Sequence, residues 1–234
     1  MKALLLIQSG AGDVVTQITE APVSETIAKM NILDLALKGG WLMLPIALFL
    51  FIALAILIER IFVIKKAGKE DPTFMNRIKD YIHEGRIDSA INLCKMTNTP
   101  ISRMIEKGIS RLGRPMNDIL VAIENVGNIE IAKLEKGFPW VATAAAAAPM
   151  IGFLGTVTGM VRAFFDMANA GANVDISLLS SGIYEALVTT VAGLVVGIIA
   201  LLAYNYLVSQ VNGAVNKMET RSMEFMDLLN EPTK

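Results

Sequence analysis

Three long stretches without a charged residue stand out in the pattern of apolar and polar positions. They cover residues 41–58, 138–161 and 186–208, and each is close to the length of about 20 residues with which an α-helix crosses a bilayer. Residues 59–137 are rich in charges, and their apolar positions recur at helical rather than alternating spacing. The pattern predicts an all-α membrane protein with three transmembrane helices and long helical extensions.

Lysine and arginine residues gather on one side of the three predicted spans. They follow the first span, precede the second and follow the third, whereas residues 166–184 contain neither. By the positive-inside rule, the N-terminus lies outside, and residues 59–137 and the C-terminus are cytoplasmic. Arg162 is an exception at the outer end of the second span, and we expect it to pair with Asp166, four residues further on.

These patterns divide the chain into seven segments. We expect an outer N-terminal segment with an interfacial helix (1–40), transmembrane helix 1 (41–64), a cytoplasmic helical domain (65–137), transmembrane helix 2 (138–164), an outer loop (165–177), transmembrane helix 3 (178–208) and a cytoplasmic C-terminal helix (209–234). The last two segments form one continuous helix that ends near Leu229.

Short helices are predicted within the cytoplasmic segment. Asp71-Pro72 and Thr99-Pro100 are typical helix starts, because a capping side chain precedes a proline at the first helical position. Gly85 fits a helix end. Gly137 and Pro139 interrupt the amphipathic helix that leads into the second span, and whether Pro139 kinks that span stays open.

The composition agrees with a membrane location. Of 234 residues, 53% are hydrophobic and 18% charged, which is too apolar for an ordinary soluble domain. A net charge of -1 gives no reason to expect nucleic-acid binding. The single cysteine, Cys94, and the single histidine, His83, lie outside the spans, which hold no set of catalytic or metal-binding side chains. We expect no enzyme activity, no metal and no cofactor.

Glu185 is the last charge before an uncharged stretch that runs to Asn216. A charged side chain within a spanning helix costs about 2.5–3.5 kcal/mol at the helix centre, so it generally faces a partner, a water-filled cavity or an ion path. We therefore interpret Glu185 as an ion-handling group that binds and releases protons. The alternative is that it lies at the outer boundary of the span and meets only water or Arg162.

Hydroxyl and small side chains accompany this carboxylate. Thr189 shares a helix face with Glu185, whereas Thr190 lies farther round the helix. Because the second and third spans are antiparallel, Thr156 can reach a similar depth, although each threonine could instead bond its own helix backbone. We predict an ion pathway formed by Glu185, Thr156, Thr189 and Thr190. Small residues at close spacing predict tight packing of the two helices at Gly152, Gly155, Gly159, Gly193 and Gly197.

Two long motifs cover the spans that carry these residues. Residues 148–160 read APMIGFLGTVTGM, and residues 182–194 read GIYEALVTTVAGL, followed by Tyr204-Asn205. Together with the shorter matches Met43-Leu44-Pro45 and Glu59-Arg60, they resemble the MotA/TolQ/ExbB proton channel family, and most closely its ExbB/TolQ branch.

The resemblance implies roles for three residues. Glu185 matches the family's pore glutamate, Thr190 the threonine five residues later, and Thr156 the threonine of the Gly-Thr-Val motif. The chain departs from the pattern at Ile198-Ile199-Ala200, where relatives often have Ile-Pro-Ala, and at Phe138-Pro139.

The resemblance also implies an assembly. We expect a homo-oligomeric ring, typically a pentamer, in the bacterial inner membrane, with a periplasmic N-terminus and a cytoplasmic C-terminus. The second and third spans would line a central pore that holds the single-span helices of an ExbD- or TolR-like partner. Ion flow would couple the proton motive force to work on a TonB- or TolA-like protein. A flagellar or gliding motor stator, and a passive scaffold with Glu185 as a structural anchor, remain alternatives, and the choice between proton and sodium stays open.

Overall fold

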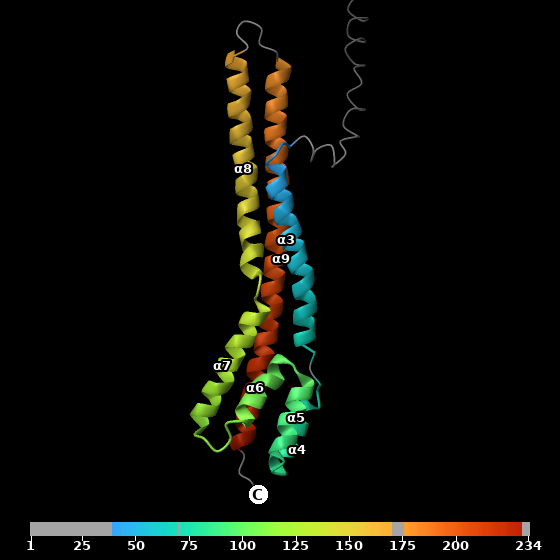
Figure 1. The fold of residues 1–234 in the computed structure, drawn as a ribbon, viewed down its shortest axis with the longest axis vertical. Helices are drawn as coiled ribbons and strands as arrows, with labels where there is room; N and C mark the ends of the chain where they lie inside the picture. The colour runs from blue at the N-terminus through green and yellow to red at the C-terminus, as the bar shows by residue number, and fades with distance from the viewer. Residues whose placement is uncertain (1–38, 70, 170–175, 231–234) are drawn as a thin grey trace, which may run out of the picture.

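The computed structural model describes residues 39–69, 71–169 and 176–230, and within them every regular element is an α-helix (Figure 1). In chain order the helices are α3 (Met43–Ala67), α4 (Phe74–His83), α5 (Ile87–Thr97), α6 (Pro100–Ile109), α7 (Met116–Leu134), α8 (Phe138–Asn169) and α9 (Ile176–Asn230). The predicted all-α class is confirmed. The interfacial helix expected ahead of Gly39 lies outside the described residues.

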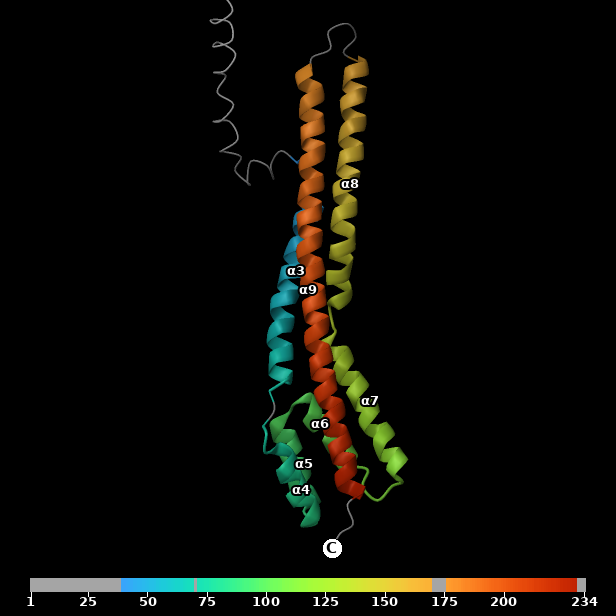
Figure 2. The ribbon, with the colours of Figure 1, turned by 180° about the vertical axis from the view of Figure 1, so that it is seen from behind.

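Helices α8 and α9 form an antiparallel hairpin that sets the long axis of the molecule (Figure 1). At 55 residues, α9 continues well past the start of α8 and ends one residue after the end expected from the sequence. Helix α3 packs along both. We call the end of the hairpin near Asn169 and Ile176 the distal end. Seen from the front and from behind, α8 and α9 continue toward it beyond the start of α3 (Figures 1 and 2).

Three of the described helices are long and apolar enough to cross a membrane, as judged by length and composition. They are Met43–Ala67, Phe138–Asn169 and Leu179–Asn230. Many of their large apolar side chains point outward, including Phe51, Phe153 and Leu202, which are all exposed. Contiguous apolar surface of this kind suits lipid or neighbouring helices rather than water. The prediction of three membrane-spanning helices is confirmed.

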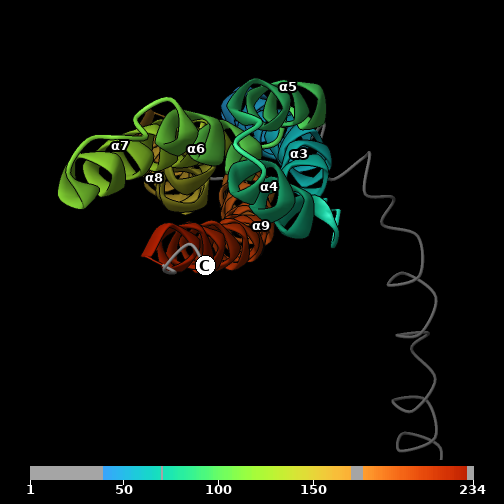
Figure 3. The same cartoon turned by 90° about the horizontal axis from the view of Figure 1, so that it is seen from below.

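The small helical domain, α4 to α7, packs on the C-terminal part of α9. Seen from below, α4 and α5 lie under α3, and α7 projects to the opposite side (Figure 3). The domain core contains Ile78, Ile105 and Ile123 together with Phe225 of α9, all almost fully buried. Cys94 is also buried there, and burial, with a smaller effect of Glu106, raises its pKa to about 12. The thiol therefore stays protonated at neutral pH.

A local signal explains the start of α6 but not the start of α4. Thr99 caps α6 in a reciprocal capping box with Ser102, in which the Ser102 amide donates to Thr99 Oγ1 at 3.2 Å. The expected cap at Asp71 is wrong. Its carboxylate instead accepts hydrogen bonds from Thr73, at 2.9 Å from the amide and 2.7 Å from the hydroxyl, in a turn that precedes α4.

The join between α7 and α8 is a break and not a proline kink. Gly137 has a φ of +93°, a left-handed conformation that favours glycine, and it separates the two helices. Pro139 lies in the first turn of α8, where the missing N–H costs no helical hydrogen bond. The interruption expected at Gly137 is present, and Pro139 adds no kink of its own because the chain turns before the proline is reached.

Buried charges tie α7 to α6 and α3. The Glu130 carboxylate, 4% exposed, accepts hydrogen bonds from Arg103 Nη2 and, at 2.7 Å, from Lys133 Nζ. Arg60 of α3 donates from Nη1 to the Lys133 carbonyl at 3.0 Å, which satisfies a free carbonyl in the last turn of α7. Burial acts to raise the pKa of Glu130, but the bonds from Arg103 and Lys133 and their charges outweigh it and lower the pKa.

This ion cluster predicts a pH-dependent contribution to stability. A carboxylate whose pKa is lower in the folded chain stabilises the fold above its ordinary value of 4.5, and this stabilisation is lost as the pH falls through the folded value. Glu130→Gln should lower the free energy of unfolding at pH 7 by about 1–3 kcal/mol. Thermal unfolding of the full chain in detergent at pH 7 and pH 4 measures this.

The exposed Glu135 offers a matched control for that measurement. Glu135→Gln removes one carboxylate at the end of the same helix and should change the unfolding temperature little at either pH. Equal effects of the two substitutions, or an effect of Glu130→Gln that persists undiminished at pH 4, would contradict the assignment.

Candidate functional site

Glycines bring the backbones of α8 and α9 together. A Cβ atom on Gly193 would lie 2.5 Å from the Ala148 carbonyl oxygen and 3.0 Å from Gly152 Cα, so a side chain has no room there. A Cβ atom on Gly159 would lie 2.8 Å from Ala186 Cβ. The same close approach is found at the other glycines expected at this interface, Gly152, Gly155 and Gly197.

Pro149 adds a special feature to this contact. Proline has no N–H, so it leaves the carbonyl of Ala145, four residues earlier in α8, without its helical hydrogen bond. Gly197 faces both groups: its Cβ atom would lie 2.5 Å from Pro149 Cγ and 3.1 Å from the Ala145 oxygen. Glycine on α9 thus accommodates the proline ring of α8.

One face of the α8–α9 contact carries a threonine pair. The hydroxyls of Thr156 and Thr190 lie 3.1 Å apart. Each is also within hydrogen-bond distance of a carbonyl of α8, with Thr156 Oγ1 2.7 Å from Phe153 O and Thr190 Oγ1 2.9 Å from Gly152 O. The pair links the two helices and is separate from Glu185.

Glu185 and Thr189 face a different space, which we call the Glu185 cavity. It has a volume of about 200 Å³ and lies where the start of α3 meets the α8–α9 hairpin. Its lining is formed by Gly39, Trp41, Leu42, Gly155, Thr158, Gly159, Arg162, Gly182, Glu185 and Thr189. The structure therefore brings Glu185 together with Thr189 and places Thr156 and Thr190 outside this cavity.

The hydroxyls of the cavity are turned toward their own helices. Thr189 Oγ1 donates to the Ala186 carbonyl at 2.8 Å, and Thr158 Oγ1 donates to the Leu154 carbonyl at 2.8 Å. A hydroxyl that donates its proton to the backbone keeps lone pairs as acceptors. The walls can therefore accept hydrogen bonds from water or from a protonated carboxyl group.

The Glu185 side chain is half-buried. Its carboxylate forms no hydrogen bond or ion pair with any residue that the structure describes. It also borders a more open hollow of about 600 Å³, lined by Ser180, Ser181 and Tyr184. A carboxylate that lines both of these spaces is accessible to water, which can deliver or remove a proton.

Gly40 lies against Glu185 on the side of α3. It has a φ of +66°, and a Cβ atom on it would overlap Oε1 of Glu185. Gly39-Gly40 directly precede the first span, but no local pattern could place them against a residue 145 positions later. Thr158 was missed as a lining residue for the same reason.

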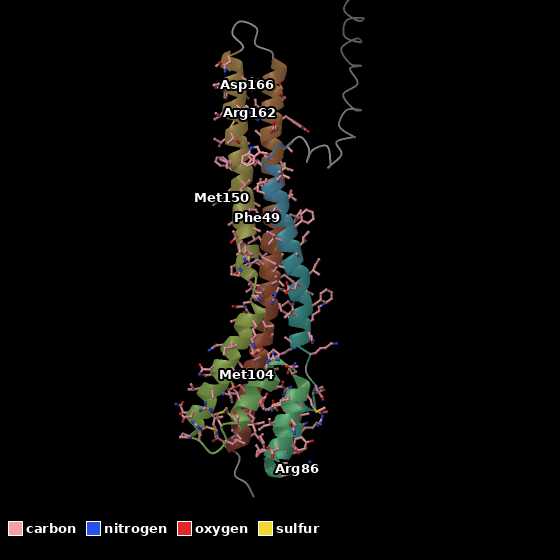
Figure 4. All side chains as sticks on the ribbon, viewed as in Figure 1. Phe49, Arg86, Met104, Met150, Arg162 and Asp166 are labelled. Atoms are coloured by element: carbon pink, nitrogen blue, oxygen red, sulfur yellow. The ribbon has the colours of Figure 1, made fainter. Side chains whose placement is uncertain are left out.

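The ion pair expected between Arg162 and Asp166 is not formed in the described part of the chain. The Arg162 side chain lines the Glu185 cavity instead. Both residues lie on the distal part of α8, beyond the start of α3 (Figure 4). The expectation was wrong because a position four residues away on a helix permits a pair but does not require one.

Substitution of Gly40 tests whether Glu185 requires the close approach of the chain just before α3. Gly40→Ala should reduce the gradient-driven activity expected from the sequence severalfold, because the new methyl group displaces the carboxylate. Gly85→Ala is the matched control: its φ is +71°, so it carries a similar backbone strain of about 1–2 kcal/mol, but nothing lies within 4 Å of the added atom. Equal loss of activity in both variants would show that strain alone is responsible.

Comparisons with known proteins agree on one family. Residues 96–220 match the model of the MotA/TolQ/ExbB proton channel family. The Tol-Pal system protein TolQ of Haemophilus influenzae is 31% identical over 229 residues, which cover 87% of this chain and 95% of the relative.

Two further relatives carry the ExbB name. The biopolymer transport protein ExbB of Neisseria gonorrhoeae is 31% identical over 135 residues, covering 52% of this chain and 61% of the relative. An ExbB homolog of Methanothermobacter thermautotrophicus is 26% identical over 193 residues, covering 81% of this chain and 67% of the relative. The matched family region contains the Glu185 cavity except for its α3 side.

Proposed function

Because the chain belongs to the MotA/TolQ/ExbB proton channel family, we propose that it is the channel and stator subunit of a proton-driven energy transducer. The complex would lie in the bacterial inner membrane and couple the proton motive force to mechanical work on a TonB- or TolA-like partner. The observation that carries this proposal is the Glu185 carboxylate, which has no bonded partner among the described residues and borders two cavities.

An unpaired carboxylate inside a membrane protein costs free energy, so it generally marks a functional site. A structural anchor would be expected to hold its carboxylate in hydrogen bonds or an ion pair, and Glu185 has neither within the described chain. One proton that crosses 100 mV releases about 2.3 kcal/mol. Several protons per cycle therefore suffice to drive a conformational step.

We assign the distal end to the periplasm and the small helical domain to the cytoplasm. Basic residues support this orientation, because Lys65 and Lys66 lie in the last turn of α3, next to the small helical domain. Protons would then enter from the distal end, reach Glu185 and leave toward the level of Thr156 and Thr190.

The exposed faces of α8 and α9 support an oligomeric ring, which we propose to be a pentamer. Large apolar side chains on these helices, such as Met150, Phe153 and Leu194, are exposed in the single chain. Neighbouring copies and the single-span helices of an ExbD- or TolR-like partner would cover them. The partner would also supply the group that accepts the proton from Glu185.

Proton flux in proteoliposomes tests the proposal. Vesicles that contain this chain with its single-span partner should acidify internally when an inward proton gradient and a membrane potential are imposed, and vesicles with the partner alone should not. A passive scaffold predicts complexes of normal composition that conduct nothing. Absence of flux in correctly assembled complexes would therefore reject the channel.

A further inference from the structure

A positively charged residue shares the cavity of the proposed ion-binding carboxylate. Arg162 and Glu185 both line the 200 Å³ space between α3, α8 and α9. Contacts between α8 and α9 place Arg162 distal to Glu185. A Cβ atom on Gly182 would lie 2.8 Å from the Cβ atom of Ala163, the residue after Arg162. Arg162 therefore lies near the level of Gly182, which is about one helical turn before Glu185 in α9.

No contact in the described part of the chain gives the Arg162 guanidinium a structural role. The guanidinium forms no ion pair with Asp166 or with any other described carboxylate. A guanidinium stays protonated at every physiological pH, so it is a fixed positive charge. An ion that enters from the distal end therefore meets this charge before it meets Glu185.

The consequence differs between a proton and a metal cation. A proton that arrives along water forms a covalent O–H bond with the carboxylate and needs no shell of ligands. Sodium must exchange its hydration shell for several oxygen ligands, and its binding depends on a net negative field. The guanidinium places a fixed positive charge in the same cavity as Glu185, which offsets the negative field that a metal cation needs.

We propose that Arg162 is a specificity-determining residue that excludes metal cations from the Glu185 cavity. The inference rests on the proposed channel function and deepens it, since it selects the proton over sodium for this chain. Arg162 does not take part in proton transfer itself. Its positive charge, rather than its shape, carries the effect.

Opposed ion gradients across proteoliposomes test this role in the complete complex. We would measure the reversal potential with a proton gradient in one direction and a sodium gradient in the other. The wild-type complex should follow the proton gradient alone. Arg162→Gln should raise the permeability of sodium relative to protons by about tenfold or more, the lower end of the range over which a local field changes ion concentration in a cleft.

Three further variants make the result decisive. Arg162→Lys keeps the charge and should keep the wild-type selectivity. Arg114→Gln removes an arginine from an exposed turn of the small helical domain and should change nothing. Arg162→Ser removes the charge with a smaller side chain and replaces the glutamine variant if that variant does not assemble.

The outcomes separate this inference from the proposed function. If Glu185→Gln conducts as wild type does, or the wild type conducts no protons, the proposed function fails and the inference fails with it. If Glu185→Gln is inactive but the neutral Arg162 variants keep the wild-type selectivity, only the role of Arg162 is rejected. Complete loss of conduction in the neutral Arg162 variants also rejects it, because a residue that only excludes metal ions is not needed for proton passage.

Discussion

A chain with Glu185→Gln is expected to assemble normally and to lose gradient-driven work. Glutamine has nearly the same shape and remains polar, so the Glu185 cavity and the contact with Gly40 should persist. It cannot bind and release a proton at any relevant pH. We expect activity to fall by roughly a hundredfold or more, the scale on which loss of a proton-transfer group slows a reaction.

The measurement compares transport or envelope function in cells with the amount of intact complex. Asp166→Asn is the matched control, because Asp166 is an exposed carboxylate on the distal part of α8 that does not line the cavity. It should leave activity nearly unchanged. Full activity of Glu185→Gln would contradict the channel, and loss of the complex itself would favour the passive scaffold.

Gly193→Ala is expected to separate α8 from α9 and to destabilise the chain. The added Cβ atom would lie 2.5 Å from the Ala148 carbonyl oxygen, which is backbone and cannot rotate away. Overpacking of this kind costs about 1–3 kcal/mol. Because the Thr156–Thr190 pair depends on the same close approach, it should be lost as well.

Gly213→Ala on the same helix is the matched control, and it is expected to leave the stability of the chain unchanged or to raise it. Nothing lies within 4 Å of a Cβ atom at Gly213, and alanine favours a helix over glycine by about 0.5–1 kcal/mol. Thermal unfolding in detergent should therefore show a lower midpoint for Gly193→Ala and an equal or higher midpoint for Gly213→Ala. Equal shifts in the two variants would mean that the α8–α9 contact is less tight than described.

Long uncharged stretches made the spans predictable, because the length of a membrane helix is set by the thickness of the bilayer. The run from Ala186 into the polar end of α9 could likewise be recognised as one helix, since it contains no proline. Capping at Thr99 is equally local and was found from the sequence. These features depend on neighbours within a few positions.

Features that depend on tertiary contacts were not predictable from one sequence. The sequence also misplaced one local feature, because Asp71 forms a turn with Thr73 ahead of α4 and does not cap the helix. At the site, the helical spacing of Thr189 and Thr190 indicates different faces. It could not show that Gly40 lies against Glu185 or that Arg162 turns into the same cavity.

Protonation of Glu185 during ion flow is the central claim, and infrared difference spectroscopy of the reconstituted complex tests it most directly. Imposing a proton gradient on the wild-type complex should produce a change in the carboxyl C=O stretch that is absent in Glu185→Gln and retained in Asp166→Asn. A carboxyl signal that survives unchanged in Glu185→Gln, while protons still cross the membrane, would contradict the account.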